Sequence, residues 1–436
     1  MKNLNIEISA KKVSLYTGTV RNDRIEQECV YKAKINTIYN DGTLSVDVDG
    51  LLRDIISGLR EAGSVDSITV TSIPHLLVVL DENDEMLFPC LSARDEKIER
   101  LGSNVIDTRP LFDECGLVPE RFSAAYQLAS LRIEDAKLFE RAFSFMFLAD
   151  YIRFVLTGVK ATDSSLALAN ALTLKDGITW NDRLFESLGI SNLFPSISES
   201  GSLLGMLEGG IAKEAGYDAG VYSNPANAVL LASSMLHPVM MITSYLGGRI
   251  GLVNNTLIAN DDVYDANGKN IKGCDGENIL LFPFRGYELI RKLKSQMPGG
   301  TSFDTIEDIA RSHRTFDYID IRDERLGRGN NIAETVNVIL TENGKESVSN
   351  EEVIGLLYNS IARYAVGMIR LLDELNESSA DEVLVIGGAA KDYYLNSLIS
   401  MHSGKKVCAS GGFFSSTFAS LYMLKKNGEV NDSQIL

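Results

Sequence analysis

The sequence predicts an α/β protein built from two similar domains. Residues 1–35 read as a β-meander, followed by an amphipathic helix from about residue 48 and a strand at 67–71. The same order of elements returns in the second half, with strands between 239 and 253, a long helix from about residue 349 and a strand at 383–386. A repeated order of this kind favours two related α/β domains with a ligand cleft between them.

Each element of the first half follows from its hydrophobic pattern. Residues 4–8 and 13–16 alternate apolar and polar side chains with the period of two that a half-buried strand requires. After residue 48, apolar side chains recur every three to four positions, which predicts a helix with one buried face. That face carries Leu51, Leu52, Ile55, Ile56 and Leu59.

The second half carries comparable signals. Residues 239–243 and 250–253 are short apolar runs that read as strands. A helix is expected to begin at the capping box formed by Ser349 and Glu352, because their side chains can satisfy each other's free backbone N–H groups. An apolar stripe then continues to about residue 372, so this helix is expected to be long.

A double glycine follows the strand at residues 383–386. Gly387 and Gly388 allow the backbone to approach a ligand closely, and the N-terminus of a helix that follows directly would favour an anion. The run from Gly387 to Ala389 is therefore a candidate phosphate-facing turn. A purely structural turn is the alternative.

These elements suggest an N-terminal domain at residues 1–236 and a C-terminal domain at 237–426. The stretch from about residue 107 to 189 is expected to be a mostly helical insertion in the first domain. Residues 427–436 read as a polar tail.

Composition excludes several classes of function. The 436 residues carry a net charge of −17, which disfavours nucleic acid or an anionic membrane surface as a partner. The five cysteines are scattered, which disfavours a zinc site and suggests free thiols. We therefore expect a soluble cytoplasmic protein in which any phosphate site is local.

Several motifs resemble those of the FGGY carbohydrate kinases, and among them those of the rhamnulokinases. The resemblance covers nearly the whole chain, and the motifs are fairly specific when taken together. They are Ala125-Tyr126-Gln127-Leu128, Asp150-Tyr151 with Leu156-Thr157-Gly158, Trp180-Asn181-Asp182 with Leu188-Gly189-Ile190, Leu384-Val385-Ile386-Gly387-Gly388, and Arg94-Asp95.

The resemblance implies two actin-like, ribonuclease-H-like domains with a cleft between them. It also implies transfer of the terminal phosphate of ATP, with Mg²⁺, to a sugar hydroxyl. By the same resemblance, Gly387, Gly388 and Ala389 would face phosphate, and Arg94, Asp95 and Gln127 would lie on the sugar side; Arg94-Asp95 matches the family motif without its tyrosine.

The nucleotide-side motifs depart from the family pattern. Family members open with Asp-x-Gly, whose aspartate helps to hold Mg²⁺, whereas this chain has Glu7 and Ser9. The longer glutamate side chain alters the reach to a metal that demands near-ideal octahedral geometry. Lys11 and Lys12 follow and could attract phosphate, although two solvated lysines are the simpler interpretation. In the second phosphate loop, Tyr245 replaces a glycine.

The sugar-side signature has lost its carboxylates. The family's Asp-Thr-Trp-Gly-Val-Asp matches residues 71–76, so that Thr71 and Leu76 stand where the two aspartates would be. His75 could bind a ligand, but a lone histidine is more often structural. Sugar hydroxyls are commonly recognised by buried carboxylates, so most inherited sugar contacts are expected to be missing.

The position of the catalytic base also differs. In the family, an aspartate at the start of a helix deprotonates the attacking sugar hydroxyl, and here that position is Pro225. Proline suits the first turn of a helix but cannot accept a proton. Asp218 is a candidate substitute base, with a turn residue as the simpler interpretation.

Two hypotheses follow from these departures. The first is a rhamnulokinase-like protein with weak or no kinase activity, which acts as a sensor, as a regulatory partner of an active kinase or as a binder of another ligand, without a required cofactor. The second is an active sugar kinase with a rebuilt site, in which Glu7 holds Mg²⁺, Lys11 or Lys12 holds phosphate, and Asp218 or Asp95 is the base. A homo-oligomer is compatible with either hypothesis.

Overall fold

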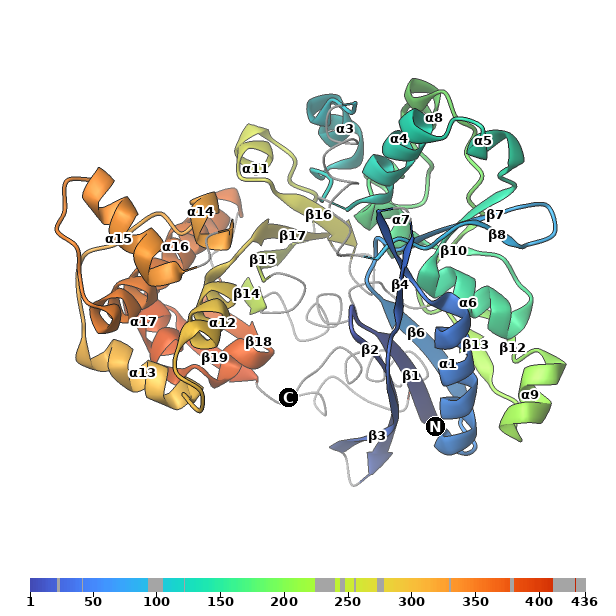
Figure 1. Ribbon diagram of the computed structural model, residues 1–436, viewed down its shortest axis with the longest axis horizontal. Coiled ribbons are helices and arrows are strands. Elements are labelled where there is room, and N and C mark those ends of the chain that lie inside the picture. The colour runs from blue at the N-terminus through green and yellow to red at the C-terminus, as the bar shows by residue number, and fades with distance from the viewer. Residues whose placement is uncertain are drawn as a thin grey trace. The chain divides into compact units, whose positions relative to one another are not determined.

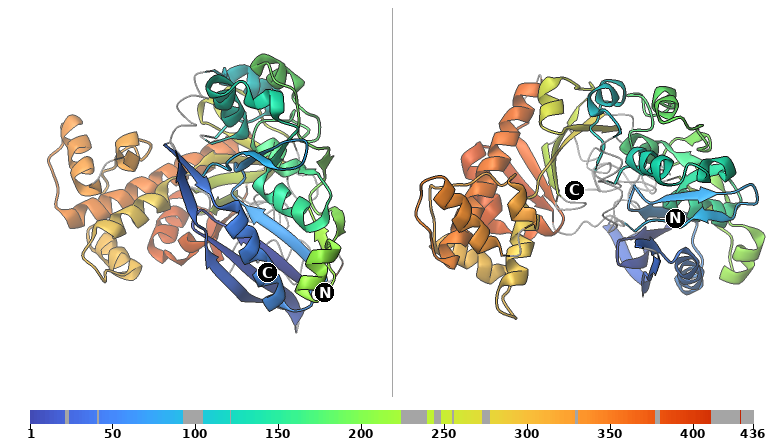
Figure 2. Two further views of the ribbon diagram at one scale, coloured as in Figure 1. Left: turned by 45° about the vertical axis from the view of Figure 1, so that its right-hand side comes forward. Right: turned by 45° about the horizontal axis from the view of Figure 1, so that its top comes forward.

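The computed structural model (Figures 1 and 2) divides into two compact units, which are described separately below. Unit 1 includes residues 1–236 and 256–278, and unit 2 includes residues 237–255 and 279–413. The residues that the structure describes are 1–21, 24–40, 42–92, 105–120, 122–223, 240–243, 248–254, 256–272, 278–328, 331–376, 380–410 and 428.

Unit 1 is built on a six-stranded sheet with the order β12-β13-β6-β1-β2-β3. The first three strands form the expected antiparallel meander, β6 pairs parallel with β1, and β13 pairs parallel with β6. The strands are β1 (Lys2–Ile8), β2 (Lys12–Arg21), β3 (Arg24–Lys34), β6 (Ser67–Ser72), β12 (Leu203–Met206) and β13 (Gly220–Tyr222).

Helix α1 (Val48–Ala62) packs against this sheet, as the apolar periodicity predicted. Asp47 caps its N-terminus by accepting the backbone N–H of Gly50. A Cβ atom at Gly58 would lie 2.5 Å from a methyl group of Leu15, so the close approach of helix and sheet depends on that glycine. The alternating apolar residues of β1 and the apolar face of α1 belong to one buried core.

The rest of unit 1 combines helices with short strands. Residues 107–189 contain several helices and two short strands. Besides α1, the helices among the described residues of this unit are α3 (Thr108–Cys115), α4 (Ala124–Glu134), α5 (Leu138–Arg141), α6 (Leu148–Thr157), α7 (Ser164–Ala169), α8 (Asp182–Leu188), α9 (Gly209–Ala215) and α11 (Asp261–Asp265). The strands are β4 (Thr37–Asn40), β5 (Thr43–Val46), β7 (Leu77–Leu80), β8 (Met86–Phe88), β9 (Ser144–Phe147), β10 (Thr162–Asp163), β11 (Ile197–Ser198) and β16 (Lys269–Lys272).

Unit 2 contains a sheet in which β17, β15, β14, β18 and β19 follow one another. Strand β14 pairs antiparallel with β15 and parallel with β18. These strands are β14 (Met240–Thr243), β15 (Arg249–Asn254), β17 (Asn278–Pro283), β18 (Glu382–Ile386) and β19 (Lys406–Ser410).

The longest helix of unit 2 is α16 (Asn350–Leu375), and it begins where the capping box predicted. The Ser349 hydroxyl accepts the N–H of Glu352, and the Glu352 carboxylate accepts the N–H of Ser349. The other helices are α12 (Gly286–Gln296), α13 (Phe303–Ser312), α14 (Glu324–Arg328), α15 (Ile332–Glu342), the 3₁₀ helix η2 (Gly388–Lys391) and α17 (Tyr393–Ser403). Within the described residues, no helix has the length and apolarity needed to cross a membrane.

Asp392 at the start of α17 makes the stability of unit 2 dependent on pH. Its carboxylate accepts hydrogen bonds from the Leu395 N–H at 3.0 Å and the Tyr358 hydroxyl at 2.8 Å. Burial is the main cause that raises the pKa of Asp392 to about 6. The folded state therefore binds a proton at the Asp392 carboxyl more tightly than the unfolded state does. The resulting contribution to folding stability is complete below about pH 4 and is lost as the pH rises through about 6.

We compare the free energy of unfolding of Asp392→Asn with that of wild type. We expect this difference to shift in favour of the variant by about 1–2 kcal/mol as the pH rises from 4 to 7.5. Asparagine is an equally good N-cap and can still accept from Tyr358. Urea unfolding at several pH values, followed by circular dichroism, measures this difference. A stability difference between variant and wild type that stays constant across the pH range would contradict the raised pKa of Asp392.

Candidate functional site

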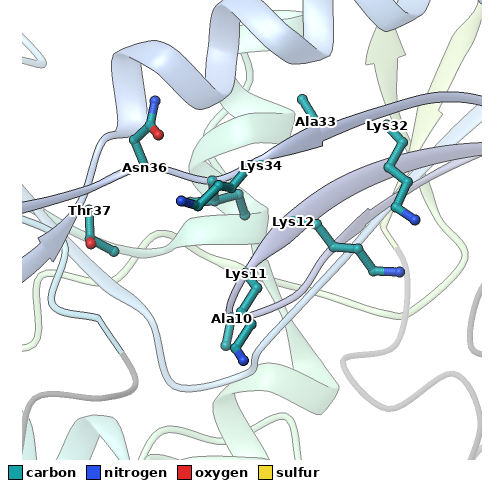
Figure 3. Close-up of a pocket in the computed structure, with 9 residues that line it drawn as sticks. Ala10, Lys11, Lys12, Lys32, Ala33, Lys34, Asn36 and Thr37 are labelled. Atoms are coloured by element: carbon teal, nitrogen blue, oxygen red, sulfur yellow. The ribbon is translucent and has the colours of Figure 1, made fainter. Parts of the chain in front are cut away.

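The turn between β1 and β2 contains the first predicted phosphate-side residues. Ser9 donates its backbone N–H and its hydroxyl to the carbonyl of Lys12, both at 2.9 Å. The Ser9 oxygen also accepts the N–H of Lys12 at 3.2 Å. These contacts close a tight turn, so the Ser9 hydroxyl serves the turn in this structure. The side chains of Lys11 and Lys12 line a groove beside it (Figure 3).

Glu7 lies near the end of β1, half-buried and directly beside Thr71 of β6. Thr71 donates its hydroxyl to Asn5 Oδ1 at 3.1 Å, and Thr69 donates to the same oxygen at 3.0 Å. Thr71 stands where the family's sugar-side signature has its first aspartate, and its side chain therefore takes part in a hydrogen bond within the sheet. Thr71 supplies a hydroxyl here and no negative charge.

Among these residues, Glu7 is the one carboxylate that could hold Mg²⁺. Mg²⁺ prefers six oxygen ligands and is usually held by one or two carboxylates together with substrate phosphates and water. Glu7 is one carboxylate, and among the described residues no group of three or more acidic, histidine or cysteine side chains could hold a metal.

His75 lies in a buried network of polar side chains in unit 1. Its Nδ1 lies 2.9 Å from Oδ1 of Asn170, and its Nε2 lies 3.1 Å from Oε2 of Glu120. Lys269 donates to the other oxygen of Glu120 at 2.7 Å. The side chains of His75 and Lys269 are only 9% and 7% exposed, whereas that of Glu120, which joins them, is 30% exposed.

Gln127 and Asn170 attach the His75 loop to the helices around it. The Gln127 amide donates to the carbonyl of His75 and, at 2.8 Å, to that of Phe122. The Asn170 amide donates to the Pro74 carbonyl at 2.8 Å. The structure thus brings together the predicted sugar-side residues His75 and Gln127, but their polar atoms are engaged with other groups of the protein.

Sequence reasoning missed Glu120, Asn170 and Lys269. Asn170 lies 95 residues from His75, and Lys269 lies 149 residues from Glu120. The sequence offers no local signal for such a contact, because spacing patterns report only neighbours on one helix or strand.

A second buried cluster surrounds Asp163, which is fully buried at the end of β10. Its carboxylate caps α7 and accepts hydrogen bonds from the hydroxyls of Ser165, Ser200 and Ser223. Ser223 follows directly after β13 and lies two residues before Pro225, so this cluster anchors the chain where it leaves the sheet. Sequence reasoning missed this cluster too, although Asp163 follows soon after the Leu-Thr-Gly motif.

Asp150 and Arg153 form a buried ion pair next to this cluster. Arg153 donates to Asp150 at 2.5 Å and to the Val70 carbonyl at 2.8 Å, and both charged side chains are 1% exposed. Burial raises the pKa of Asp150 to about 7, while the Arg153 charge acts in the opposite direction. The family-like Asp150-Tyr151 motif thus has a structural role, because it ties α6 to strand β6.

Asp218 is exposed in the turn before β13, where its carboxylate accepts the N–H of Ala219 at 2.9 Å. Strand β13 runs parallel to β6 from Ser67, whereas Glu7 is level with Thr71 at the other end. Four residues of strand span about 13 Å, which is beyond hydrogen-bond reach. The structure therefore does not bring Asp218 close to Glu7, and its placement is that of a turn residue.

The glycine turn of unit 2 differs from its expected form. Gly387 has φ +89°, a left-handed conformation that favours glycine. A short 3₁₀ helix then follows, and the α-helix begins only at Tyr393. Asp392 caps that α-helix with its own carboxylate, so the helix that begins beside Gly388 is the short 3₁₀ helix, whose N-terminus has no side-chain cap. Ala389 is buried, and its carbonyl accepts from Asn396.

Gly248 requires the absence of a side chain for a packing reason. Its φ is +75°, and a Cβ atom there would lie 2.1 Å from the carbonyl oxygen of Phe284. This glycine therefore allows two backbone segments of unit 2 to meet. The predicted site residues Arg94, Asp95, Pro225 and Tyr245 lie outside the described residues.

A family model for the FGGY family of carbohydrate kinases, N-terminal domain, matches residues 48–223. Residues 48–223 are therefore similar to the N-terminal domain of this family. The chain is 28% identical to a rhamnulokinase of Oceanobacillus iheyensis over 425 residues, which cover 93% of this chain and 89% of that relative. A rhamnulokinase of Bacillus subtilis is 23% identical over 423 residues, which cover 93% and 86% of the two chains.

Solved structures of sugar kinases share the fold. A gluconate kinase from Lactobacillus acidophilus matches with a TM-score of 0.79 at 14% identity. The match covers 100% of this chain and 91% of the gluconate kinase chain. A Plasmodium falciparum glycerol kinase with ADP matches with a TM-score of 0.77 at 12% identity, and covers 99% and 92%. The expected fold class, that of FGGY sugar kinases with two actin-like domains, is confirmed.

Proposed function

We propose that this FGGY-family, rhamnulokinase-like protein has weak or no sugar-kinase activity and acts as a sensor or as a regulatory partner of an active kinase. The main support is that side chains of residues 71–76, which match the family's sugar-side signature, are already hydrogen-bonded to other groups of the protein. His75 is engaged by Asn170 and Glu120, and Thr71 is engaged by Asn5. Side chains that make these contacts would have to break them before they could bind a sugar hydroxyl.

A second function is an active kinase with a rebuilt site. The observation that favours it is the pair of lysines beside the first turn, since positioned positive charge is a large part of phosphoryl-transfer catalysis. Its weakness is the base, because Asp218 lies at the wrong end of β13. Asp95 remains a prediction from sequence alone.

Titration calorimetry with ATP and ADP, with and without Mg²⁺, tests the proposed function. A working kinase of this family binds the metal–nucleotide complex, so Mg²⁺ would tighten binding. We expect no such tightening, because Ser9 stands where the family pattern has a glycine and its hydroxyl is held within the turn by Lys12. Micromolar binding that requires Mg²⁺ would overturn this proposal and favour the active kinase.

A further inference from the structure

A groove of about 850 Å³ in unit 1 is lined by four lysines and no carboxylate (Figure 3). Lys11 and Lys12 come from the turn between β1 and β2 and from the start of β2. Lys32 and Lys34 come from the end of β3. The volume falls within the range of small-molecule sites in proteins.

The strand register concentrates this positive charge. In the antiparallel pair of β2 and β3, Lys12 lies directly opposite Lys34, and Ser14 lies opposite Lys32. Residues that face each other in such a pair place their side chains on the same face of the sheet, where like charges are destabilising. The hairpin therefore holds Lys12, Lys32 and Lys34 on one face at an electrostatic cost.

Within the described residues, none of the four ammonium groups has an ion-pair partner. Glu7 lies on the next strand, opposite Ser14, and does not line the groove. The chain as a whole has a net charge of −17, so carboxylates are abundant elsewhere. A cluster of four cations without a carboxylate is therefore a local feature, and a bound anion would relieve its repulsion.

Protection of a sheet edge explains only part of the cluster. Strand β3 is the edge of the sheet, and exposed lysines on edge strands deter pairing with another chain. This accounts for Lys32 and Lys34. It does not account for Lys11 in the turn. It also does not account for Lys12, because strand β2 is paired with β1 on one side and β3 on the other.

We propose that this lysine groove binds a small molecule that carries several phosphate groups, and that it does so without a divalent metal. Lysine is a common point-charge partner of phosphate, and four ammonium groups suit an anion with three or more negative charges. The acidic remainder of the chain disfavours an extended polyanion such as nucleic acid. The inference goes beyond the proposed function, because it requires neither a sugar nor a phosphoryl transfer.

The test uses inorganic tripolyphosphate as the probe, titrated into the full-length protein by calorimetry with EDTA present. Lys32→Glu/Lys34→Glu is compared with Lys137→Glu/Lys213→Glu, which alters two exposed lysines beside α5 and in α9 and changes the net charge equally. We expect wild type and the control pair to bind alike. We expect the groove pair to bind at least about tenfold more weakly.

Three results would overturn the proposal: no binding by wild type in EDTA, an equal loss in both pairs, or binding that requires Mg²⁺. If the glutamate pair fails to fold, Lys32→Gln/Lys34→Gln gives the same comparison with a smaller change of charge. Mg²⁺ neutralises part of the probe, so it should weaken binding to the groove. A kinase site would instead bind ATP more tightly with Mg²⁺, so failure of this inference and failure of the proposed function are distinguishable.

Discussion

Purified protein is expected to phosphorylate rhamnulose with Mg-ATP at least about 10²–10⁴-fold more slowly than an active rhamnulokinase, because a positioned general base contributes that factor. Proline at position 225 cannot accept the proton of the attacking hydroxyl. Thr71 and Leu76 also supply no carboxylate to hold the sugar. An assay that couples ADP release to NADH oxidation measures the rate, and the Oceanobacillus iheyensis relative is a suitable positive control.

A single reversion separates loss of the base from loss of the sugar site. We expect Pro225→Asp to leave the rate close to that of wild type, because His75 stays engaged with Glu120 and Asn170 and Thr71 with Asn5. Recovery by 100-fold or more would mean that only the base is missing. Wild-type turnover comparable with that of the positive control would contradict the proposed function itself.

Replacing Arg153 by alanine is expected to destabilise unit 1 by about 3–5 kcal/mol, because it leaves the buried Asp150 carboxylate without its ionic partner. The substitution also removes the hydrogen bond to the Val70 carbonyl of strand β6. Arg141→Ala changes an exposed arginine in α5 and is expected to have an effect within about 0.5 kcal/mol.

Tryptophan fluorescence can follow this loss in unit 1 alone. The chain has a single tryptophan, and Trp180 stacks on Phe194 of the same unit with ring centroids 5.4 Å apart. Urea unfolding monitored at this residue therefore reports unit 1, whereas circular dichroism reports both units. An Arg153→Ala midpoint equal to that of Arg141→Ala would contradict the structural role of the ion pair.

Local patterns predicted much of the fold. The alternation in β1 and β2, the apolar face of α1 and the capping box of α16 each depend on residues close together in sequence, so their elements were predictable. The 3₁₀ helix that begins at Gly388 was not predictable, because the glycine pattern marks a turn without specifying which kind of helix follows.

The candidate site was predictable only where a motif marked it. His75 and Gln127 were chosen from motifs, and the structure brings them together. Their partners Asn170 and Glu120 lie on distant parts of the chain, and only the folded structure pairs them. The lysines of β3 were also missed, because strand register decides that Lys34 lies opposite Lys12.

The division of the chain into units affects how the protein folds during synthesis. Lys269 bonds to Glu120 across 149 residues, and Asn270 bonds to the Gly116 carbonyl across 154 residues, all within unit 1. Ribosomes add about 5–20 residues per second, so roughly 7–30 seconds separate the synthesis of these partners. During that interval Glu120 is on a nascent chain without Lys269, and residues 237–255 of unit 2 are made before unit 1 is complete. Unit 1 therefore cannot finish folding in simple N-to-C order, and this interval is when a chaperone would be most needed.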